Sequence, residues 1–360
     1  MVSFTGYAFT DYGENIIILA AMAFFGLSIC MDLELKKMWP WYVGLGALGV
    51  LFYYFQKQAL ILRIVLAILA GRKKDSREVV KVFFWGTLGV TFVTAVLSFF
   101  GVGRDFYVID TFRHVDEIRY QFGFLHPNSF ALFWFKVLVF GLYAYVVPGE
   151  KGKLPKPVLY GIAILFLAPL YFAKSKTAFA LGGAAIVGFL ACDLIRWKGF
   201  RTMLYIFGNA LMAFEVWALF SCMTWLWPVE GKANKFWWFL NYLTTGRTHL
   251  IHTLHENVKP TWMGVSLGSD ATEVGFVNAL YNQGKLFIIL YLIVLFGLFF
   301  WLYRRKNAAG MILVLAFTAY ASAEAFLPYF NKNGVWFMLL GVGTYFSQKE
   351  KKENENRCSN

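Results

Sequence analysis

The chain has 360 residues, of which 59% are hydrophobic, 20% are aromatic and only 15% are charged. Soluble domains carry about 25% charged residues and about 45–50% apolar ones, so this composition excludes a soluble globule, a disordered chain and a fibrous protein. The net charge of +13 would suit a nucleic-acid partner, but the Lys and Arg residues that gather in the cytoplasmic loops of membrane proteins explain it better.

Apolar runs follow one another along most of the chain. Residues 1–14 contain no Lys or Arg, so the first run is predicted to be a permanent span and not a cleaved signal peptide. We expect an all-α integral membrane protein: one polytopic bundle over 1–360 with about 11 (10–12) transmembrane helices of about 20 residues, two of the candidates being shorter. The candidate spans are 15–31, 39–55, 58–70, 82–102, 126–147, 158–173, 177–195, 203–222, 285–303, 309–327 and 334–347.

Positive charge predicts the orientation of these spans. The short loops on one side are rich in Lys and Arg, as in Arg72-Lys73-Lys74, and the short loops on the other side are nearly bare. The positive-inside rule then places the N-terminus outside and the C-terminus in the cytoplasm, although a twelfth span would reverse the N-terminal side. Two larger extracytoplasmic loops are expected near 103–125 and 223–284, and a disordered cytoplasmic tail over 348–360.

Motifs for several other chemistries are missing from the sequence. The four cysteines are scattered without a C-x-x-C spacing, which predicts neither a disulfide framework nor a zinc site. The sequence also lacks a Walker loop, a dinucleotide-binding fingerprint and a G-x-S-x-G elbow. We therefore expect no cofactor and no metal.

The first external loop combines two arginines with a His-Pro-Asn sequence at the start of a span. Arg113 and Arg119 lie six residues apart, and His126-Pro127-Asn128 follows. A guanidinium group binds phosphate oxygens through two parallel hydrogen bonds, so a phosphate site is one interpretation. The alternative is that the arginines contact lipid headgroups or neighbouring carboxylates, while Pro127 and Asn128 only shape the first helical turn.

The second external loop contains Arg247 and three histidines at helical spacing, His249, His252 and His255. A zinc site is the weaker interpretation, because the H-E-x-x-H pattern is missing and zinc needs further ligands. We expect Arg247 to be a second phosphate clamp with a histidine or carboxylate nearby as a base. The alternative is that these histidines face water or lipid headgroups.

Some charged residues fall within the predicted spans or at their ends. Arg63, Lys136, Glu215 and Glu324 lie within spans, where a charge is costly and often functional. Ion pairs between helices are the structural alternative, as is snorkelling of Arg63 toward an interface. The stretch Ser175-Lys176-Thr177 adds a cation at the outer end of a span.

Four stretches together resemble one family. The stretch Arg119-x3-Gly123-Phe124-x-His126-Pro127-Asn128 resembles the signature of Wzy-type polysaccharide polymerases from Gram-positive capsule and exopolysaccharide clusters, within the O-antigen ligase and polymerase superfamily. Further motifs of the family are similar, in the same order, to Ser175-Lys176-Thr177, to Thr245-Gly246-Arg247, and to Asn278-Ala279 with the later Gly284. The chain departs from the family at Val277 and Leu280, where the family has Asp and Tyr, although Glu273 is near in sequence.

The resemblance implies a glycosyltransferase that joins repeat units carried on undecaprenyl pyrophosphate, at the outer face of the bacterial cytoplasmic membrane. An acceptor hydroxyl would attack the anomeric carbon, and the lipid pyrophosphate would leave. The expected catalytic residues are Arg119 and Arg247 as the pyrophosphate clamp, and His126 and His252 as candidate bases. Substrate contacts are expected from Arg113, Asn128, Lys176, His249, His255, Glu273 and Asn278.

The same resemblance implies membrane lipids as partners, together with a chain-length regulator and a flippase of the pathway, and no nucleic acid. Two alternatives stay open. A ligase of the superfamily would pass a finished glycan to a different acceptor with the same arginines and topology. A lipid-linked oligosaccharide flippase is less favoured, because carriers often have inverted repeats and charged midplane sites, whereas this chain has no internal repeat and its richest polar clusters lie in external loops.

Overall fold

The computed structural model describes residues 23, 26, 29, 35–56, 60–71, 75–110, 117–146, 155–195, 197–224, 247–265, 267, 274–324, 326, 333–336, 338 and 339. The chain divides into two compact units. Unit 1 comprises Met1–Trp39, Leu66–Arg196 and Trp336–Asn360, and unit 2 comprises Pro40–Val65 and Trp197–Val335.

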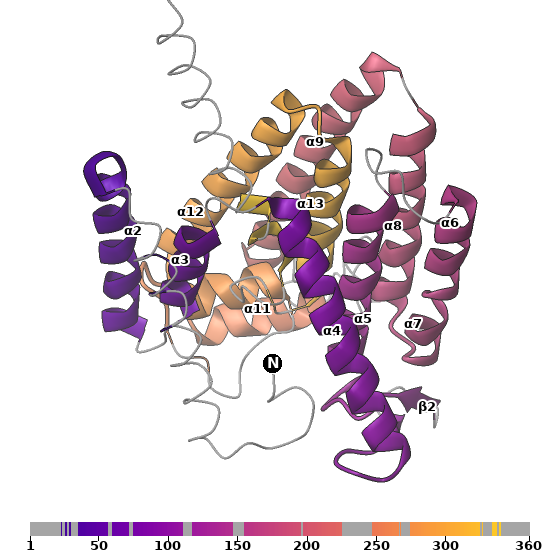
Figure 1. Cartoon of the computed structure of the whole chain (residues 1–360). Helices are drawn as coiled ribbons and strands as arrows, with labels where there is room; N and C mark the ends of the chain where they lie inside the picture. Colours follow the sequence, from indigo (N-terminus) through magenta and orange to yellow (C-terminus); the bar gives the residue numbers. More distant parts are fainter. Residues whose placement is uncertain are drawn as a thin grey trace, which may run out of the picture. The chain divides into compact units, whose positions relative to one another are not determined.

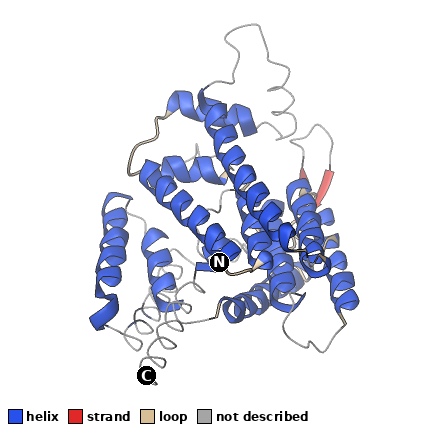
Figure 2. Cartoon of the chain, turned by 90° about the horizontal axis from the view of Figure 1, so that it is seen from above, coloured by secondary structure: helices blue, strands red, loops and turns tan. Residues whose placement is uncertain are grey.

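The described part of the chain is helical apart from one two-stranded sheet, which confirms the predicted all-α class (Figure 1; Figure 2). Unit 1 contains α4 (Ser76–Phe99), β1 (Tyr107–Asp110), β2 (Glu117–Tyr120), α5 (Pro127–Gly141), the π-helix η2 (Leu142–Val146), α6 (Lys156–Leu165), α7 (Ala168–Phe172) and α8 (Lys176–Leu194). Unit 2 contains α9 (Lys198–Thr224), α11 (Arg247–Asn257), α12 (Gly275–Arg304) and α13 (Ala308–Ala321). The helices α2 (Leu35–Gln56) and α3 (Leu60–Gly71) each continue from one unit into the other.

Four described helical stretches are long and apolar enough to cross a membrane: Ser76–Phe99, Pro127–Val146, Lys176–Leu194 and Gly275–Arg304. Four shorter apolar stretches correspond to other predicted spans: Val43–Phe55, Ile61–Ala70, Lys156–Phe172 and Ala308–Ala321. The predicted spans 15–31 and 334–347 and the tail 348–360 lie largely or wholly outside the described residues. The number of spans therefore stays a prediction.

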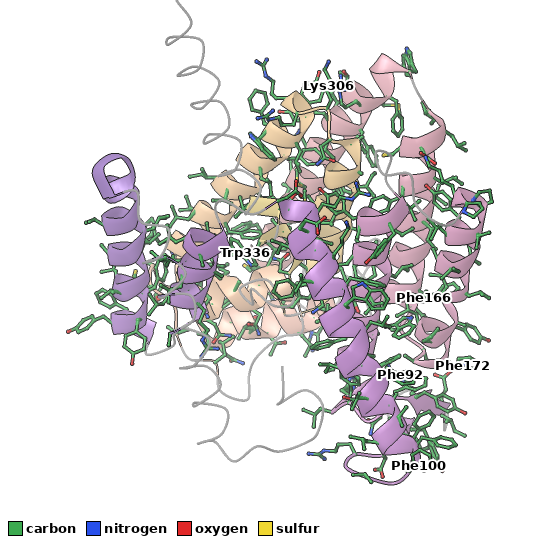
Figure 3. The ribbon with its side chains drawn as sticks, viewed as in Figure 1. Phe92, Phe100, Phe166, Phe172, Lys306 and Trp336 are labelled. Atoms are coloured by element: carbon green, nitrogen blue, oxygen red, sulfur yellow. The ribbon has the colours of Figure 1, made fainter. Side chains whose placement is uncertain are left out.

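Helix α4 has the reverse of the polarity found in soluble helices. Its buried residues are Val80, Phe84, Thr87, Thr91, Thr94 and Ser98, spaced alternately by three and four so that they form one face. This face packs mainly on α5. Large apolar side chains such as Phe92 are exposed on the other face, and Phe100 is exposed just past its end (Figure 3). Small hydroxyl residues facing protein and bulky apolar ones facing outward are typical of helices packed in lipid.

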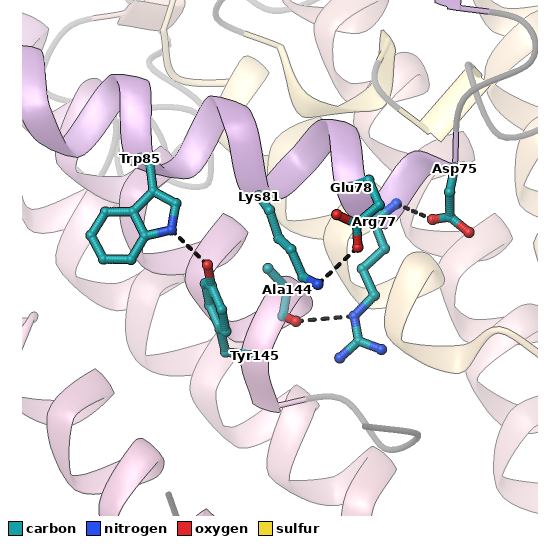
Figure 4. Close-up of polar contacts among 7 residues, drawn as sticks. All are labelled: Asp75, Arg77, Glu78, Lys81, Trp85, Ala144 and Tyr145. Carbon is teal, nitrogen blue, oxygen red and sulfur yellow. Dashed lines mark hydrogen bonds and ion pairs between the residues drawn. The ribbon is translucent and has the colours of Figure 1, made fainter. Parts of the chain in front are cut away.

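The π-helix at the end of α5 is tied to the first turns of α4 (Figure 4). Arg77 Nε donates a hydrogen bond to the carbonyl oxygen of Ala144 (3.0 Å), and Trp85 Nε1 donates to the hydroxyl of Tyr145 (2.7 Å). Asp75 caps α4 by accepting the backbone N–H of Arg77 (2.7 Å). The wider turn of the π-helix η2 is thus held by side chains of α4.

The predicted span 158–173 is two helices and not one. Helix α6 ends at Leu165 and α7 begins at Ala168, with Pro169 in its first turn. Proline has no N–H to continue the ladder of α6, so backbone groups are released at the break. One of them, the carbonyl oxygen of Phe166, accepts a hydrogen bond from Trp134 Nε1 of α5 (2.7 Å).

Helices α9, α12 and α13 pack on one another, and α11 packs on α9. The contact between α9 and α12 depends on a glycine and a ring stack. A Cβ added to Gly208 would lie 2.7 Å from Cε1 of Phe299. Tyr205 stacks on Phe299 and on Tyr303, with ring centroids 5.8 and 4.6 Å apart.

Helix α12 is interrupted at Gly284, whose φ of 90° and ψ of 170° are not helical. The segment from Thr261 onward fills the break. The N–H groups of Lys285 and Leu286 donate to the carbonyl oxygens of Thr261 (2.9 Å) and Trp262 (3.2 Å). In return, Val265 N–H donates to the carbonyl oxygen of Tyr281 (2.7 Å). We call residues 261–265 and 267 the inserted segment.

Two glycines allow the inserted segment to pass close to α12 at the break. Gly264 and Gly284 both have φ of 90°, and a Cβ on Gly284 would lie 2.5 Å from the nitrogen of Gly264. The residues before the break, 275–283, were expected to be loop but are helical, and the inserted segment supplies a partner to the carbonyl oxygen of Tyr281 near their end. The residues after it begin at Lys285, which is where the sequence predicted a span to start.

The break predicts an asymmetry between two glycines of the same helix. Gly284→Ala should lower the thermal unfolding midpoint of the protein in detergent, with a loss of about 1–3 kcal/mol, because an L-residue at this backbone conformation is strained. Gly297→Ala, in open space on the helical part of α12, should be neutral or slightly stabilising. Equal midpoints for the two variants would contradict the inserted-segment geometry.

Candidate functional site

In unit 1 a short hairpin presents Arg119. Strands β1 and β2 pair antiparallel, with Val108 opposite Arg119. Neighbouring side chains of a strand point to opposite faces, and Ile118 is 50% exposed while Arg119 is only 3% exposed. After β2 the chain turns at Gly123 (φ 80°), where a Cβ would lie 2.8 Å from the carbonyl oxygen of Thr94 on α4. The hairpin is therefore fixed against a long helix.

Arg119 joins two of the stretches singled out in the sequence. Its Nη2 donates to Oδ1 of Asn128 in the first turn of α5 (2.9 Å), and its Nε donates to the carbonyl oxygen of Ala173 (3.3 Å). Ala173 directly precedes the Lys174-Ser175-Lys176 turn between α7 and α8. Because Arg119 is buried and bonded to both segments, it acts here as a brace that positions them and not as an open phosphate clamp.

His126 is the N-cap residue of α5, and its side chain is exposed. Its Nδ1 accepts a hydrogen bond from the backbone N–H of Asn128 (3.1 Å). A neutral imidazole that accepts at Nδ1 carries its proton on Nε2. Nε2 can then donate a hydrogen bond but cannot take up a proton, so this geometry disfavours His126 as a general base.

The turn between α7 and α8 borders a pocket of about 350 Å³ in unit 1. Lys174, Ser175 and Lys176 line it, together with Glu117 of β2. Lys176 is exposed, and Lys174 Nζ lies 3.4 Å from Oε1 of Glu117. The pocket therefore combines a mostly apolar lining with two cations and one carboxylate.

In unit 2 the charged residue Arg247 opens α11. Its Nη2 lies 3.5 Å from Oε1 of Glu324, and the two side chains are 15% and 14% exposed. Glu324 was expected within a span, but α13 ends at Ala321 and Glu324 follows in a turn. A cation held by a largely buried carboxylate keeps a fixed position, which suits a residue that binds a charged group.

The three histidines of α11 have different surroundings. His249 is exposed. His252 Nε2 lies 3.2 Å from Oε1 of Glu256, one turn along the same helix. His255 Nδ1 lies 2.7 Å from the hydroxyl oxygen of the fully buried Tyr281 on α12. Within the described residues no group of three His, Cys, Asp or Glu side chains is placed to hold a metal ion.

His255 has the electrostatics of a base. Partial burial lowers its pKa from the ordinary value of 6.5, and the nearby charges of Lys259 and His252 lower the pKa further, against an opposing effect of Glu256. The lowered pKa favours the neutral, proton-accepting form of the ring. The sequence favoured His252 as the base and gave His255 a substrate contact, whereas this geometry favours His255.

Asn278 has a supporting role in unit 2. Asn282 Nδ2 donates to Oδ1 of Asn278 (2.9 Å), and Asn282 Oδ1 accepts the N–H of Leu267 in the inserted segment (3.3 Å). Val277 and Leu280, the two departures from the family pattern, are 1% and 4% exposed and pack in the apolar core. The tyrosine that reaches a histidine is Tyr281, one residue later.

The structure thus groups Arg119, His126, Asn128 and Lys176 in unit 1, and Arg247, His249, His252, His255 and Asn278 in unit 2. Arg113 and Glu273, and the Thr245-Gly246 pair, lie outside the described residues. Sequence analysis missed Tyr281, Lys174 and Glu117. No local pattern marks them, because each becomes relevant only through a partner distant in sequence or through the fold of a turn.

Comparison with known proteins identifies no relative: no family model, no curated protein and no solved structure matches this chain.

Because Arg119 holds two segments together, substituting it is predicted to lower the stability of the protein. Arg119→Ala should destabilise the protein by about 2 kcal/mol or more, because the Asn128 side chain and the Ala173 carbonyl lose their partner and a buried unsatisfied group costs about 1–3 kcal/mol. Arg119→Lys should not restore the midpoint, since an ammonium group lacks the planar fork. Thermal unfolding in detergent would measure this.

The matched control is Arg104→Ala, an exposed arginine between α4 and β1, which should leave the midpoint unchanged. An Arg119→Ala protein as stable as this control would contradict the brace.

Proposed function

We propose that the chain is a glycosyltransferase, a polysaccharide polymerase that joins oligosaccharide repeat units carried on undecaprenyl pyrophosphate. The reaction takes place at the outer face of the bacterial cytoplasmic membrane. The observation that carries the proposal is the His255–Tyr281 pair, 2.7 Å apart, on a helix that opens with Arg247. A neutral imidazole with a buried hydroxyl partner, close in sequence to a held cation, suits attack by a sugar hydroxyl on an activated glycan.

Support also comes from unit 1. The resemblance to the polymerases rests partly on the Arg119–Asn128 stretch and on Ser175-Lys176-Thr177. Arg119 is bonded to Asn128 and to Ala173, so these two stretches lie together although they are distant in sequence. A shared location is what a common role in one site requires.

The proposed reaction has one chemical step at the sugar. Tyr281 accepts the Nδ1–H of His255, which leaves the lone pair of Nε2 free to take the proton of the acceptor hydroxyl. The acceptor oxygen forms a bond to the anomeric carbon of the donor glycan. The bond from that carbon to the pyrophosphate oxygen breaks, and the electron pair leaves with the lipid pyrophosphate. The proton ends on His255, and the glycan is longer by one repeat unit.

Arg247 stabilises the leaving group in this scheme. The pyrophosphate gains negative charge as its bond to carbon breaks, and cations that are already in place need no reorganisation at that moment. Arg247 is suited to this because Glu324 holds it at 3.5 Å.

His255→Ala should lower the rate of chain elongation by about 10²–10⁴-fold, the usual contribution of a general base. The assay supplies the purified protein in detergent with one lipid-pyrophosphate-linked repeat unit and follows the product ladder on a gel. Leu250→Ala, an exposed residue of the same helix, is the matched control and should elongate at the parental rate.

Parental rates in His255→Ala would remove His255 from the reaction and leave the polymerase proposal standing. A parent that makes no ladder from intact substrate, but transfers the glycan to another acceptor, would make the chain a ligase.

The elongation rate should depend on pH through His255. Partial burial lowers its pKa from the ordinary value of 6.5, so the proton-accepting form is favoured near pH 7 and is lost as the pH falls through the lowered pKa. The rate should therefore be flat from about pH 7 upward and fall on the acid side.

Tyr281→Phe should lower the plateau rate more than it changes KM, because the His255 ring loses the partner that fixes its proton on Nδ1.

The groups that face His255 and can alter its titration are Lys259, His252 and Glu256 on its own helix and Tyr281 on α12. A rate that keeps rising above pH 8 would point to a base other than His255.

A further inference from the structure

Unit 1 contains a further cavity, whose walls come from α4, α5, η2 and α6. Its volume is about 310 Å³. At its edge α4 approaches α5 closely, because a Cβ added to Gly141 would lie 2.9 Å from Cε2 of Phe84. The cavity lies beside this contact, where Ile162 and Ala163 of α6 complete the wall.

The lining of this cavity is apolar. The polar side-chain groups among its lining residues are the indole of Trp85 and the hydroxyl of Tyr145, and these two are hydrogen-bonded to each other at 2.7 Å. An ordered water needs two to four polar partners, whereas an apolar cavity of about 150 Å³ stays dry and takes up benzene. With roughly twice that volume, this cavity suits a segment of a hydrocarbon chain.

The rim of the cavity is exposed. Trp85 is 60% exposed, Ile162 is 39% exposed and Tyr145 is 37% exposed. On a helix long and apolar enough to cross a membrane, such as α4, exposed apolar side chains face lipid. Trp and Tyr gather where the lipid chains meet the headgroups. A lipid chain therefore reaches the cavity directly from the bilayer.

Tyr145 has a donor to offer to such a lipid. It lies in the π-helix η2, and short π-helical turns often occur at functional sites. Its oxygen accepts the indole N–H of Trp85, so its own O–H can donate to an ester or phosphate oxygen.

Basic side chains continue from the rim toward the start of α4. Arg77, Lys81 and Trp85 are spaced by four, which places them on one face of the helix, and Figure 4 shows them projecting toward η2. Lys81 Nζ donates to Oε1 of Glu78 (2.8 Å), whose side chain is 64% exposed. An ion pair this exposed is weak, so Lys81 can exchange it for a phosphate.

The sequence at this end of α4 carries an excess of positive charge. Residues 72–81 contain five basic residues and two acidic ones, and the positive-inside rule predicts that this end is cytoplasmic. Trp85 is the tenth residue of α4, about 15 Å from its start, which corresponds to the cytoplasmic half of a bilayer core about 30 Å thick. Clusters of four to eight Lys and Arg at the cytoplasmic end of a span attract anionic lipids.

We propose that this cavity binds one acyl chain of an anionic phospholipid of the cytoplasmic leaflet. Lys81 and Arg77 contact its phosphate, and the hydroxyl of Tyr145 contacts its ester region. The bound chain fills the space between α4, η2 and α6 and so stabilises unit 1. This lipid is not the substrate of the proposed polymerase, whose reaction is placed at the opposite face of the membrane. The lipid site therefore does not rest on the proposed function.

The test uses the full-length protein, purified in detergent and stripped of lipid. Native mass spectrometry measures the binding of phosphatidylglycerol and of phosphatidylcholine with identical acyl chains, which differ in the net charge of the headgroup. Phosphatidylglycerol should bind more tightly and raise the thermal unfolding midpoint more at equal concentration. In midpoint measurements at about 0.5 M salt this difference should shrink, because salt screens exposed charges.

Lys81→Gln should weaken the binding of phosphatidylglycerol about fivefold, since one basic residue near a lipid surface contributes about 1 kcal/mol. Binding of phosphatidylcholine and the midpoint without lipid should stay at the parental values, because the lost ion pair is weak. Arg104→Gln makes the same change of charge at an exposed residue beyond the other end of α4. This control should bind both lipids like the parent.

Ala163→Phe places a ring in the cavity and should weaken the binding of both phospholipids by about tenfold or more. Its matched control is Ala184→Phe, at an exposed alanine of α8 outside the lining, which should bind like the parent. The Lys81→Gln result does not depend on whether the larger side chain is tolerated at position 163.

Equal binding of the two phospholipids by the parent would overturn the anionic site. Parental binding of phosphatidylglycerol by both Lys81→Gln and Ala163→Phe would overturn the location of the site. Displacement of phosphatidylglycerol by an equal or lower concentration of a prenyl phosphate would overturn the assigned occupant, because the cavity would then prefer a prenyl chain.

Discussion

Backbone groups that leave a helix in apolar surroundings must find partners inside the protein, and this constraint shapes three interruptions of the described helices. At Gly284 the inserted segment supplies carbonyl oxygens to the N–H groups of Lys285 and Leu286. At the α6–α7 break an indole N–H of α5 reaches the carbonyl oxygen of Phe166. At the π-helix, the Arg77 guanidinium reaches the carbonyl oxygen of Ala144. Each interruption is therefore a fixed feature, held by a specific partner.

The same interruptions position the side chains of the candidate functional sites. The residues of α12 before Gly284 form a separate helical piece that carries Tyr281, and Tyr281 reaches His255 on α11. The α6–α7 break leads directly to the turn with Lys174 and Ser175 at the start of α8. An uninterrupted pair of spans would offer neither arrangement, because a continuous helix has no free N–H group away from its first turn.

Burial and hydrogen bonding change the roles that sequence analysis assigned to several residues. Arg119 was expected to clamp pyrophosphate, and in the structure it is buried, with Nη2 and Nε bonded to Asn128 and Ala173. His126 was a candidate base, but its Nδ1 caps α5. Among the described residues, Lys176 and Ser175 of unit 1 and Arg247 and His255 of unit 2 stay candidates for contact with a ligand. A guanidinium with two carbonyl-type partners is a strong structural element, and lysines on a turn retain the freedom to meet a ligand.

The sequence by itself determined the helical class, the apolar runs and the start of a span at Lys285, because hydropathy and charge are local properties of the chain. It also identified Arg119, Asn128, Ser175, Lys176, Arg247 and the histidines of α11 as residues of interest. Only the tertiary structure decided which of them are braces and which face a pocket or a partner, and it added Tyr281, Lys174 and Glu117. The physical reason is that hydrogen-bond satisfaction depends on neighbours brought together by folding, such as Arg119 and Ala173, and no local pattern encodes such a pair.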